Sequence, residues 1–166
     1  LSIDDTSRTF FTFDCNPTGS DQKYAANQHK CRQYARQHGI RVYDIDKGIG
    51  THVLIEEGLA YPGSTAISTD SHANILGAVG AFGQGMGDQD IAFTYKAGKT
   101  WFEVPRSMKV TVKGELKPPC TAKELTLACL QRLGASGALG QAVEYSGPAV
   151  EALDLPGRIT LASMMT

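Results

Sequence analysis

The chain has 166 residues, of which 42% are hydrophobic and 20% are charged, as in an ordinary globular protein with a core. Its 16 basic and 17 acidic side chains give a net charge of −1, which argues against nucleic acid or an anionic membrane surface as a partner. No apolar run approaches the roughly 20 residues of a membrane-spanning helix, and no signal-peptide pattern opens the sequence. We therefore expect a cytoplasmic protein with no nucleic-acid and no membrane partner.

The cysteines and the two ends of the sequence set further limits. Cysteines stand at positions 15, 31, 120 and 129, and none belongs to a C-x-x-C pair, which excludes a zinc ribbon and a self-contained ferredoxin motif. Their irregular spacing also argues against a disulfide scaffold. Because Leu1 is not an initiator methionine and the residues up to Thr166 have the pattern of a continuing helix, we expect a piece of a longer chain.

The first half of the chain alternates predicted strands and helices. Thr9–Asp14 is rich in aromatic and β-branched residues and predicts a buried strand that ends on a carboxylate. Residues 20–38 have helical periodicity, with Ser20 as the expected N-cap and Gly39 as the C-terminal stop. Ile40–Ile45 predicts a second strand, and a loop over residues 46–52 is expected to follow it.

The stretch Thr65–Gly87 combines a short strand, a polar cluster and a run of glycines. Thr65–Thr69 predicts a strand that delivers Asp70, Ser71 and His72 to its carboxyl end. Glycines then recur at positions 77, 80, 83, 85 and 87, which predicts a turn leading into a helix. In α/β proteins such an arrangement builds a ligand site at the edge of the sheet, so we expect a site for a small anionic ligand.

The second half continues the alternation. A helix is expected from Asp88 to Gly98, an extended segment from Trp101 to Val104, a strand around Met108–Val112, a helix with a capping box from Thr121 to Leu133, and a strand at Ala142–Tyr145. This order predicts an α/β protein with a layered α/β/α arrangement, divided into a first lobe at 1–104 and the start of a second at 105–166.

At four places the sequence puts reactive side chains just after predicted strands. These are Asp14-Cys15-Asn16, Thr51-His52, Asp70-Ser71-His72 and Glu144. Carboxylates beside histidines suit general acid–base chemistry, because the carboxylate orients the imidazole and raises its basicity.

Other site classes are less compatible with the sequence. Ser71 lies between Asp70 and His72, but neighbours on extended chain point to opposite faces and no G-x-S-x-G motif is present, which argues against a serine hydrolase. A zinc site from His52, Asp70 and His72 lacks helical H-x-x-x-H spacing. The glycines at positions 77–87 match neither the dinucleotide fingerprint nor a P-loop. The alternative to ligand contact is a structural role, in which they allow a helix to pack closely on the sheet.

The segment TDSHANILGAVGAFGQGMGDQDIA resembles the D-S-H-T-x-x-x-G-A-x-G-A signature of the aconitase superfamily, and within it the large subunits of 3-isopropylmalate dehydratases and homoaconitases. PGSTAISTDSH, GKTWFEVPRSMKVTVKGEL and TAKELTLACLQRLGASGALGQAVEYSGPAVEALDLPGRITLASM extend the resemblance. It implies reversible dehydration and hydration of a hydroxy di- or tricarboxylic acid, such as 3-isopropylmalate or homocitrate. It also implies a [4Fe–4S] cluster in the full-length protein, acting as a Lewis acid, and a small swivelling subunit or domain as partner.

By position, the resemblance implies a set of site residues. Asp70 would orient a histidine of the GIGTH loop, His72 would pair with Glu144, and Asp14 would support the residue after it. The implied catalytic residues are Asp14, His52, Asp70, His72 and Glu144, and the implied substrate-binding residues are Cys15, Asn16, Thr51 and Ser71.

The sequence departs from the family pattern at three points. Cys15 replaces the usual histidine, Thr51 stands where the loop histidine falls so that His52 is one place late, and Ala73 replaces a threonine. The cluster cysteines of the family lie beyond this chain, so no metal ligands are expected here and the chain alone is expected to be inactive. Aconitate or dimethylmaleate hydration, and a non-catalytic binding or assembly module, remain alternatives.

Overall fold

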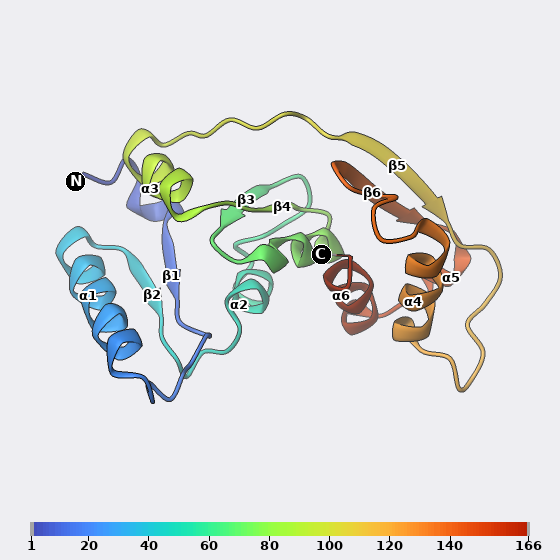
Figure 1. The fold of residues 1–166 in the computed structure, drawn as a ribbon, viewed down its shortest axis with the longest axis horizontal. Helices are drawn as coiled ribbons and strands as arrows, with labels where there is room; N and C mark the ends of the chain where they lie inside the picture. The colour runs from blue at the N-terminus through green and yellow to red at the C-terminus, as the bar shows by residue number, and fades with distance from the viewer. Residues whose placement is uncertain (1, 166) are drawn as a thin grey trace.

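The computed structural model describes residues 2–165, in which strands alternate with helices (Figure 1). The elements are, in order, η1 (Thr6–Arg8), β1 (Phe10–Thr12), α1 (Gln22–His38), β2 (Arg41–Tyr43), α2 (Gly50–Glu56), β3 (Thr65–Ser68), η2 (Ser71–Val79), β4 (Phe82–Gly85), α3 (Asp88–Ala97), β5 (Arg106–Thr111), α4 (Ala122–Leu133), β6 (Gln141–Ser146), α5 (Pro148–Glu151) and α6 (Leu155–Ser163), where η denotes a 3₁₀ helix. The α/β class is confirmed. None of the helices in this part of the chain has the length and apolar character needed to cross a bilayer.

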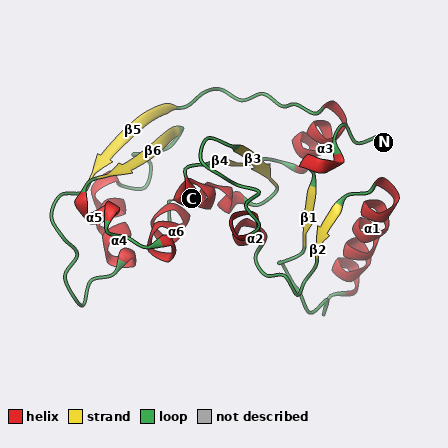
Figure 2. Cartoon of the chain, turned by 180° about the vertical axis from the view of Figure 1, so that it is seen from behind, coloured by secondary structure: helices red, strands yellow, loops and turns green. Residues whose placement is uncertain are grey.

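The six strands form three two-stranded sheets, and each sheet is parallel. β1 pairs with β2, β3 with β4, and β5 with β6. Two parallel strands need a crossover between them, and α1, η2 and α4 supply the helical part of the three crossovers (Figure 2). The predicted alternation of strands and helices therefore corresponds to three units, each made of a strand, a helical crossover and a parallel strand.

The three sheets lie along the length of an elongated molecule. β1 and β2 lie with α1 at one end, β3 and β4 lie with α2 and η2 in the middle, and β5 and β6 lie with α4 and α5 at the other end (Figure 1). α6 returns to the middle and packs on η2, where the Asn74 side-chain amide donates to the Ala162 carbonyl at 2.8 Å. Residues of the second expected lobe, 105–166, thus contact the first, and the boundary near Pro105 stays a prediction.

Most helix ends lie where the sequence predicts them. Thr121 and Glu124 form the expected capping box at α4, and Gly39 ends α1 in the left-handed conformation. The predicted N-cap of α1 was wrong by one residue. Asp21 caps the helix by accepting from the Tyr24 N–H at 2.9 Å, whereas the Ser20 hydroxyl donates to the Asn16 side chain. The continuation of the last helix through Thr166 lies outside the described residues, and α6 itself ends at Ser163.

The glycine-rich stretch differs from the prediction. The expected turn and helix are instead a 3₁₀ helix, η2, followed by strand β4. A Cβ atom on Gly83 would collide with the Ala73 carbonyl oxygen, and one on Gly85 would lie 2.9 Å from the carbonyl oxygen of Asp70. These glycines therefore let the backbone of η2 lie directly on β4. Glycines two residues apart fit a strand as well as a turn, which explains why their spacing did not distinguish the two.

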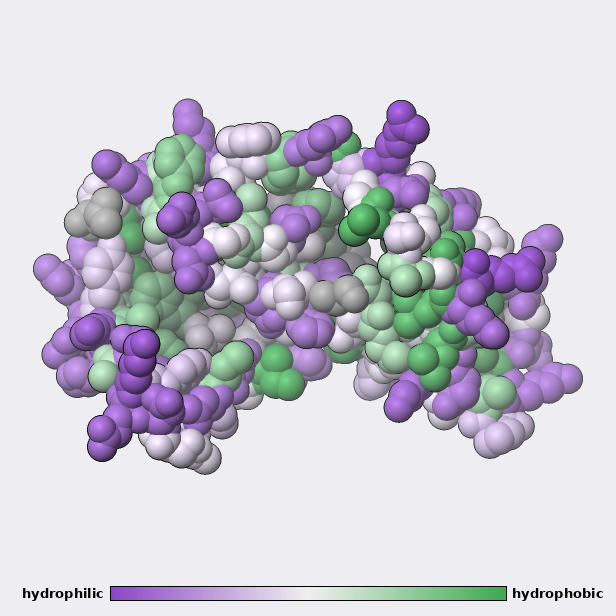
Figure 3. Space-filling model, in the orientation of Figure 1, coloured by the Kyte–Doolittle hydropathy of each residue, from purple (hydrophilic) through white to green (hydrophobic). Residues whose placement is uncertain are grey.

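The core of the middle part lies beneath η2. Ala60, Leu76 and Ala81 are buried there, and partly buried apolar side chains of α2, β3 and η2 pack against them. Elsewhere some large apolar side chains are exposed, with Trp101, Val104 and Leu139 more than four-fifths accessible. Figure 3 shows hydrophobic residues gathered over the part that carries α4 and α5. Patches of this kind often mark contacts with other segments or proteins.

Replacing Gly83 with alanine should destabilise the protein by about 2–4 kcal/mol, because the new methyl group must displace the η2 backbone at Ala73. The matched control is Gly77→Ala on η2, where an added methyl group meets nothing within 4 Å. That variant should change the free energy of unfolding by about 1 kcal/mol or less. Urea unfolding of the two variants measures both, and equal effects would contradict the packing described for β4.

Candidate active site

Asp14 joins the end of β1 to the beginning of α2. One of its carboxylate oxygens, Oδ2, accepts a hydrogen bond from the Gly50 N–H at 2.6 Å. Gly50 has no room for a side chain, because a Cβ atom there would collide with the Thr12 hydroxyl. A carboxylate is also favoured at a helix start, where backbone N–H groups are unpaired. The first predicted acid is thus held at the carboxyl end of its strand.

Cys15 lies beside two carboxylates. Burial raises the pKa of its thiol, and the negative charges of Asp14 and Asp70 raise it further, while a hydrogen bond with Tyr24 acts in the opposite direction. Asp14 and Asp70 follow strands of different sheets, and both carboxylates lie within electrostatic reach of the Cys15 thiol. Near neutral pH, Cys15 is therefore a neutral thiol rather than a thiolate nucleophile.

Asn16 has a local structural contact. Its backbone adopts a positive φ of 49°, and its side-chain oxygen accepts from the Ser20 hydroxyl at 3.2 Å. Asparagine tolerates this conformation better than most residues, so it suits the turn between β1 and α1.

Thr51 and His52 lie in the first turn of α2, and the prediction that they follow a strand in a loop was wrong. Thr51 is only 2% exposed, and its hydroxyl is buried without a hydrogen-bond partner among the described residues. Nδ1 of His52 is also buried and has no partner in this part of the chain. Unpaired buried polar atoms are costly and rare, so these two atoms are the most unusual polar groups near Asp14.

Asp70, Ser71 and His72 form a compact cluster at the start of η2. Oδ1 of Asp70 accepts from the His72 N–H at 2.9 Å and lies 3.3 Å from Nδ1 of the same histidine. The Ser71 hydroxyl lies 3.4 Å from this nitrogen. The expectation that the three side chains diverge was wrong, because the backbone turns into a helix here.

This cluster still does not have the geometry of a serine hydrolase. In a catalytic triad the serine and the carboxylate contact different nitrogens of the histidine ring. Here both approach Nδ1, and Nε2 has no hydrogen-bond partner among the described residues.

A hollow of about 390 Å³ lies beside the cluster, over the ends of β3 and β4. It is lined by Thr69, Ser71, Gln84, Gly85, Met86 and Gly87. Ser71, which was predicted to contact the substrate, thus lines a space large enough for a small molecule.

Glu144 lies within a strand, as predicted for Ala142–Tyr145, rather than just after one, where the site residues were expected to gather. It is in the middle of β6, directly opposite Lys109 of β5, and its side chain is exposed. No hydrogen bond or ion pair joins Glu144 to His72 in the described part of the chain. The pairing implied for these two residues therefore stays a prediction.

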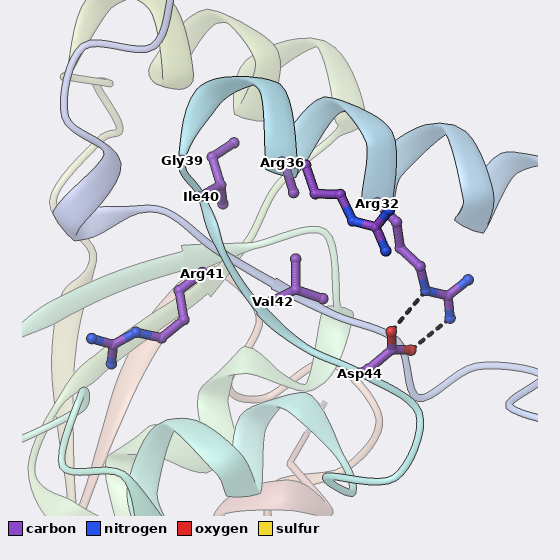
Figure 4. Close-up of a pocket in the computed structure, with 8 residues that line it drawn as sticks. Arg32, Arg36, Gly39, Ile40, Arg41, Val42 and Asp44 are labelled. Atoms are coloured by element: carbon purple, nitrogen blue, oxygen red, sulfur yellow. Dashed lines mark hydrogen bonds and ion pairs between the residues drawn. The ribbon is translucent and has the colours of Figure 1, made fainter.

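A second hollow, of about 400 Å³, lies between α1 and β2 and contains three arginines (Figure 4). Arg32 donates to both carboxylate oxygens of Asp44, at 2.8 and 2.6 Å, and lies over the Phe13 ring. Arg41 donates to the Tyr43 hydroxyl. Arg36 lies in the last turn of α1, where a cation is favoured by the helix dipole. Arg32 and Arg41 are thus engaged by groups of the fold, and none of Asp70, Ser71 and His72 lines this hollow.

The described residues do not form a metal site of their own. Within residues 2–165, no three histidine, cysteine, aspartate or glutamate side chains lie together as metal ligands, and the cysteines are unpaired. A [4Fe–4S] cluster needs several thiolates at one place, so the residues present do not fit such a group.

The structure thus brings together Asp14, Cys15 and Asp70, and it places Ser71 and His72 beside Asp70. Sequence reasoning missed Tyr24 and Gln84, which approach Cys15 and line the hollow, respectively. Tyr24 could have been found, because it lies one turn into the helix that follows Cys15. Nothing in the sequence indicated that Gln84 would lie at the site, because the residues around it were not predicted to form a strand.

Comparison with known proteins identifies the class of protein to which this arrangement belongs. The Aconitase family (aconitate hydratase) matches residues 5–166, so the chain belongs to the aconitase family. It is 45% identical over 141 residues, or 84% of its length, to the homoaconitase large subunit of Thermus thermophilus. It is 45% identical over 140 residues, again 84% of its length, to the 3-isopropylmalate dehydratase large subunit 1 of Deinococcus radiodurans.

A third relative covers more of the chain. A probable methanogen homoaconitase large subunit from Methanosarcina mazei is 39% identical over 161 residues, which is 96% of this chain. The matched region makes up 34%, 32% and 41% of the three relatives, so the chain spans about a third of their length. Members of the family generally carry a [4Fe–4S] cluster, and its site is not seen in the described residues.

Replacing Thr51 with valine should leave stability unchanged or raise it by about 1 kcal/mol, because the change removes an unpaired buried hydroxyl. Thr126→Val is the matched control, since Thr126 is equally buried but donates to the Ala122 carbonyl at 2.7 Å. That variant should lose about 1 kcal/mol. Thermal unfolding compares the two, and a larger loss at Thr51 would show that its hydroxyl is paired.

The ion pair between Arg32 and Asp44 should make stability depend on pH. Hydrogen bonds from Arg32 lower the pKa of Asp44 from 3.8 to about 2. A carboxyl group with a lowered pKa stabilises the fold above its unfolded pKa, and this contribution is lost as the pH falls from about 4 to about 2. Arg32→Gln should therefore lower the free energy of unfolding by about 1 kcal/mol or less at pH 6. The difference from wild type should shrink as the pH falls towards 2.

The control for this pair is Arg8→Gln, which removes a more exposed ion pair with Asp5. When the free energy of unfolding is measured over the same pH range, Arg8→Gln should lower it by less than Arg32→Gln does. A loss for Arg32→Gln that does not vary with pH would mean that packing on Phe13, not the charge on Asp44, accounts for the contribution of Arg32.

Proposed function

We propose that this chain is part of the large subunit of a hydro-lyase that reversibly dehydrates a hydroxy di- or tricarboxylic acid of the 3-isopropylmalate or homocitrate type. The family match supports the reaction class. Among the residues, the proposal rests on the contact between the Asp70 carboxylate and the His72 ring, which lies beside a hollow of about 390 Å³. A dehydration needs a group that delivers a proton to the departing hydroxyl, and a carboxylate–imidazole pair can do so.

The geometry assigns a protonation pattern to this pair. A carboxylate accepts hydrogen bonds, so Oδ1 of Asp70 favours the tautomer of His72 that carries its proton on Nδ1. Nε2 is then free to take a proton from, or as part of the imidazolium to give one to, an oxygen of the substrate. The Ser71 hydroxyl lines the hollow and can hydrogen-bond the same molecule.

Asp14 and Cys15 act at the rim of this site. Asp14 fixes the start of α2 through the Gly50 N–H, and so holds Thr51 and His52 in place. Cys15, as a neutral thiol, can donate a weak hydrogen bond without adding negative charge beside the carboxylates.

We infer that the full-length protein carries a [4Fe–4S] cluster whose ligands lie outside residues 2–165, and that it works with a small subunit. When bound, such a cluster supplies a Lewis acid for the substrate's hydroxyl group. No step of that chemistry is assigned to the present residues. The relatives' names describe them as large subunits, which supports a small-subunit partner.

The second candidate is a non-catalytic binding module that keeps the scaffold. The observation that favours it is the departure from the family pattern at Cys15 and Thr51. Within the family, aconitate or dimethylmaleate hydration is the other reaction to consider. Turnover by the complete enzyme separates the catalytic proposals from the binding module.

His72→Gln and Asp70→Asn should each lower kcat of the reconstituted full-length enzyme about 100-fold or more, because proton transfer loses its acid–base group or its orientation. His29→Gln is the matched control, since His29 is an exposed histidine on α1. It should keep kcat within about twofold of wild type. Steady-state kinetics and circular dichroism check activity and folding, and full activity in both site variants would refute the assignment.

A further inference from the structure

α1, the turn after it and β2 form a basic segment of the chain. Residues 22–43 carry five lysine and arginine side chains and no aspartate or glutamate. The five are Lys23, Lys30, Arg32, Arg36 and Arg41. Because the whole chain has 16 basic and 17 acidic side chains, this excess of positive charge is local. None of the five lines the hollow over β3 and β4, so the candidate active site does not explain them.

Three of these side chains, Arg32, Arg36 and Arg41, line the hollow of about 400 Å³ between α1 and β2. Asp44 is the acidic side chain in the same lining, so the lining has two more positive than negative charges. Arg32 and Arg36 are four residues apart on α1 and share one face of the helix, where like charges repel. Figure 4 shows these two side chains next to each other, with Arg41 extending away from them. An anion beside Arg32 and Arg36 would relieve this repulsion.

The carboxylates near the hollow offset only part of its positive charge. Asp44 accepts two hydrogen bonds from Arg32, at 2.8 and 2.6 Å, and so balances one cation. Glu57 lies within electrostatic reach of Arg41, but it does not line the hollow. Arg36 is exposed, so its guanidinium group can be reached by a dissolved ion.

The end of α1 and the start of β2 supply the rest of the lining. The last carbonyl groups of a helix carry partial negative charge, but that of Ala35 already accepts from the N–H groups of Gly39 and Ile40. Ala35 and Ile40 are buried and Val42 is half-buried, so they give the hollow an apolar surface. A molecule in this hollow would therefore meet guanidinium groups and apolar side chains together.

From these observations we propose that the hollow between α1 and β2 binds a small organic phosphate. The fork of N–H groups on a guanidinium matches the oxygens of a phosphate group. A phosphate monoester carries close to two negative charges near neutral pH, which balances the excess in the lining, whereas a single carboxylate would balance half of it. The organic part would contact the apolar side chains. This site is separate from the candidate active site and does not depend on the proposed hydro-lyase function.

The test is isothermal titration calorimetry of the full-length protein with its small subunit, in about 0.15 M salt so that diffuse charge effects are screened. The probes are phenyl phosphate and, as a dianion without phosphate, succinate. Wild type should bind phenyl phosphate with a Kd below about 1 mM, and more tightly than succinate. Arg36→Gln should weaken phenyl phosphate binding about tenfold. Arg36→Lys, which keeps the charge but loses the fork, should weaken it about threefold.

Arg132→Gln is the matched control, because Arg132 is also an exposed arginine in the last turn of a helix, α4. It should leave the Kd within about twofold of wild type. The inference would be overturned by a wild type that binds no phenyl phosphate or prefers succinate, or by equal losses in Arg36→Gln and Arg132→Gln. A loss in Ser71→Ala but not in Arg36→Gln would place the phosphate in the hollow over β3 and β4, and would overturn it too. None of these results bears on the hydro-lyase function, which turnover tests separately.

Discussion

The candidate site depends on the close approach of η2 to β4. Gly83 faces the Ala73 carbonyl and Gly85 faces the backbone of Asp70 and Ser71, so neither position has room for a side chain. This contact sets where η2 begins, and the start of η2 places Asp70, Ser71 and His72 at the end of β3. These two glycines therefore set the backbone position of Asp70, Ser71 and His72.

The charge distribution of the site follows from the same arrangement. Two carboxylates, Asp14 and Asp70, lie close enough to influence one thiol, and the described residues that line the adjacent hollow include no cation. A site with this balance can hold and move protons, but it does not by itself attract an anionic substrate.

Local sequence signals predicted the elements well and the site only in part. The capping box at Thr121, the glycine stop at Gly39 and the alternating pattern of β5 each have a local physical cause, so they could be recognised from neighbouring residues. The strand β4 could not, because its glycines are explained by contacts with η2. The placement of Thr51 and His52 in a helix also depends on a distant residue, since Asp14 binds the first N–H group of α2.

The central claim is that the position of η2 holds the Asp70 carboxylate against Nδ1 of His72. The most direct measurement is the tautomer of neutral His72, read from the ¹⁵N chemical shifts of the histidine-labelled full-length protein. We expect the proton on Nδ1 in the wild type and a shift towards the Nε2–H tautomer in Asp70→Asn. A wild-type His72 that already carries its proton on Nε2, unchanged by Asp70→Asn, would contradict the account.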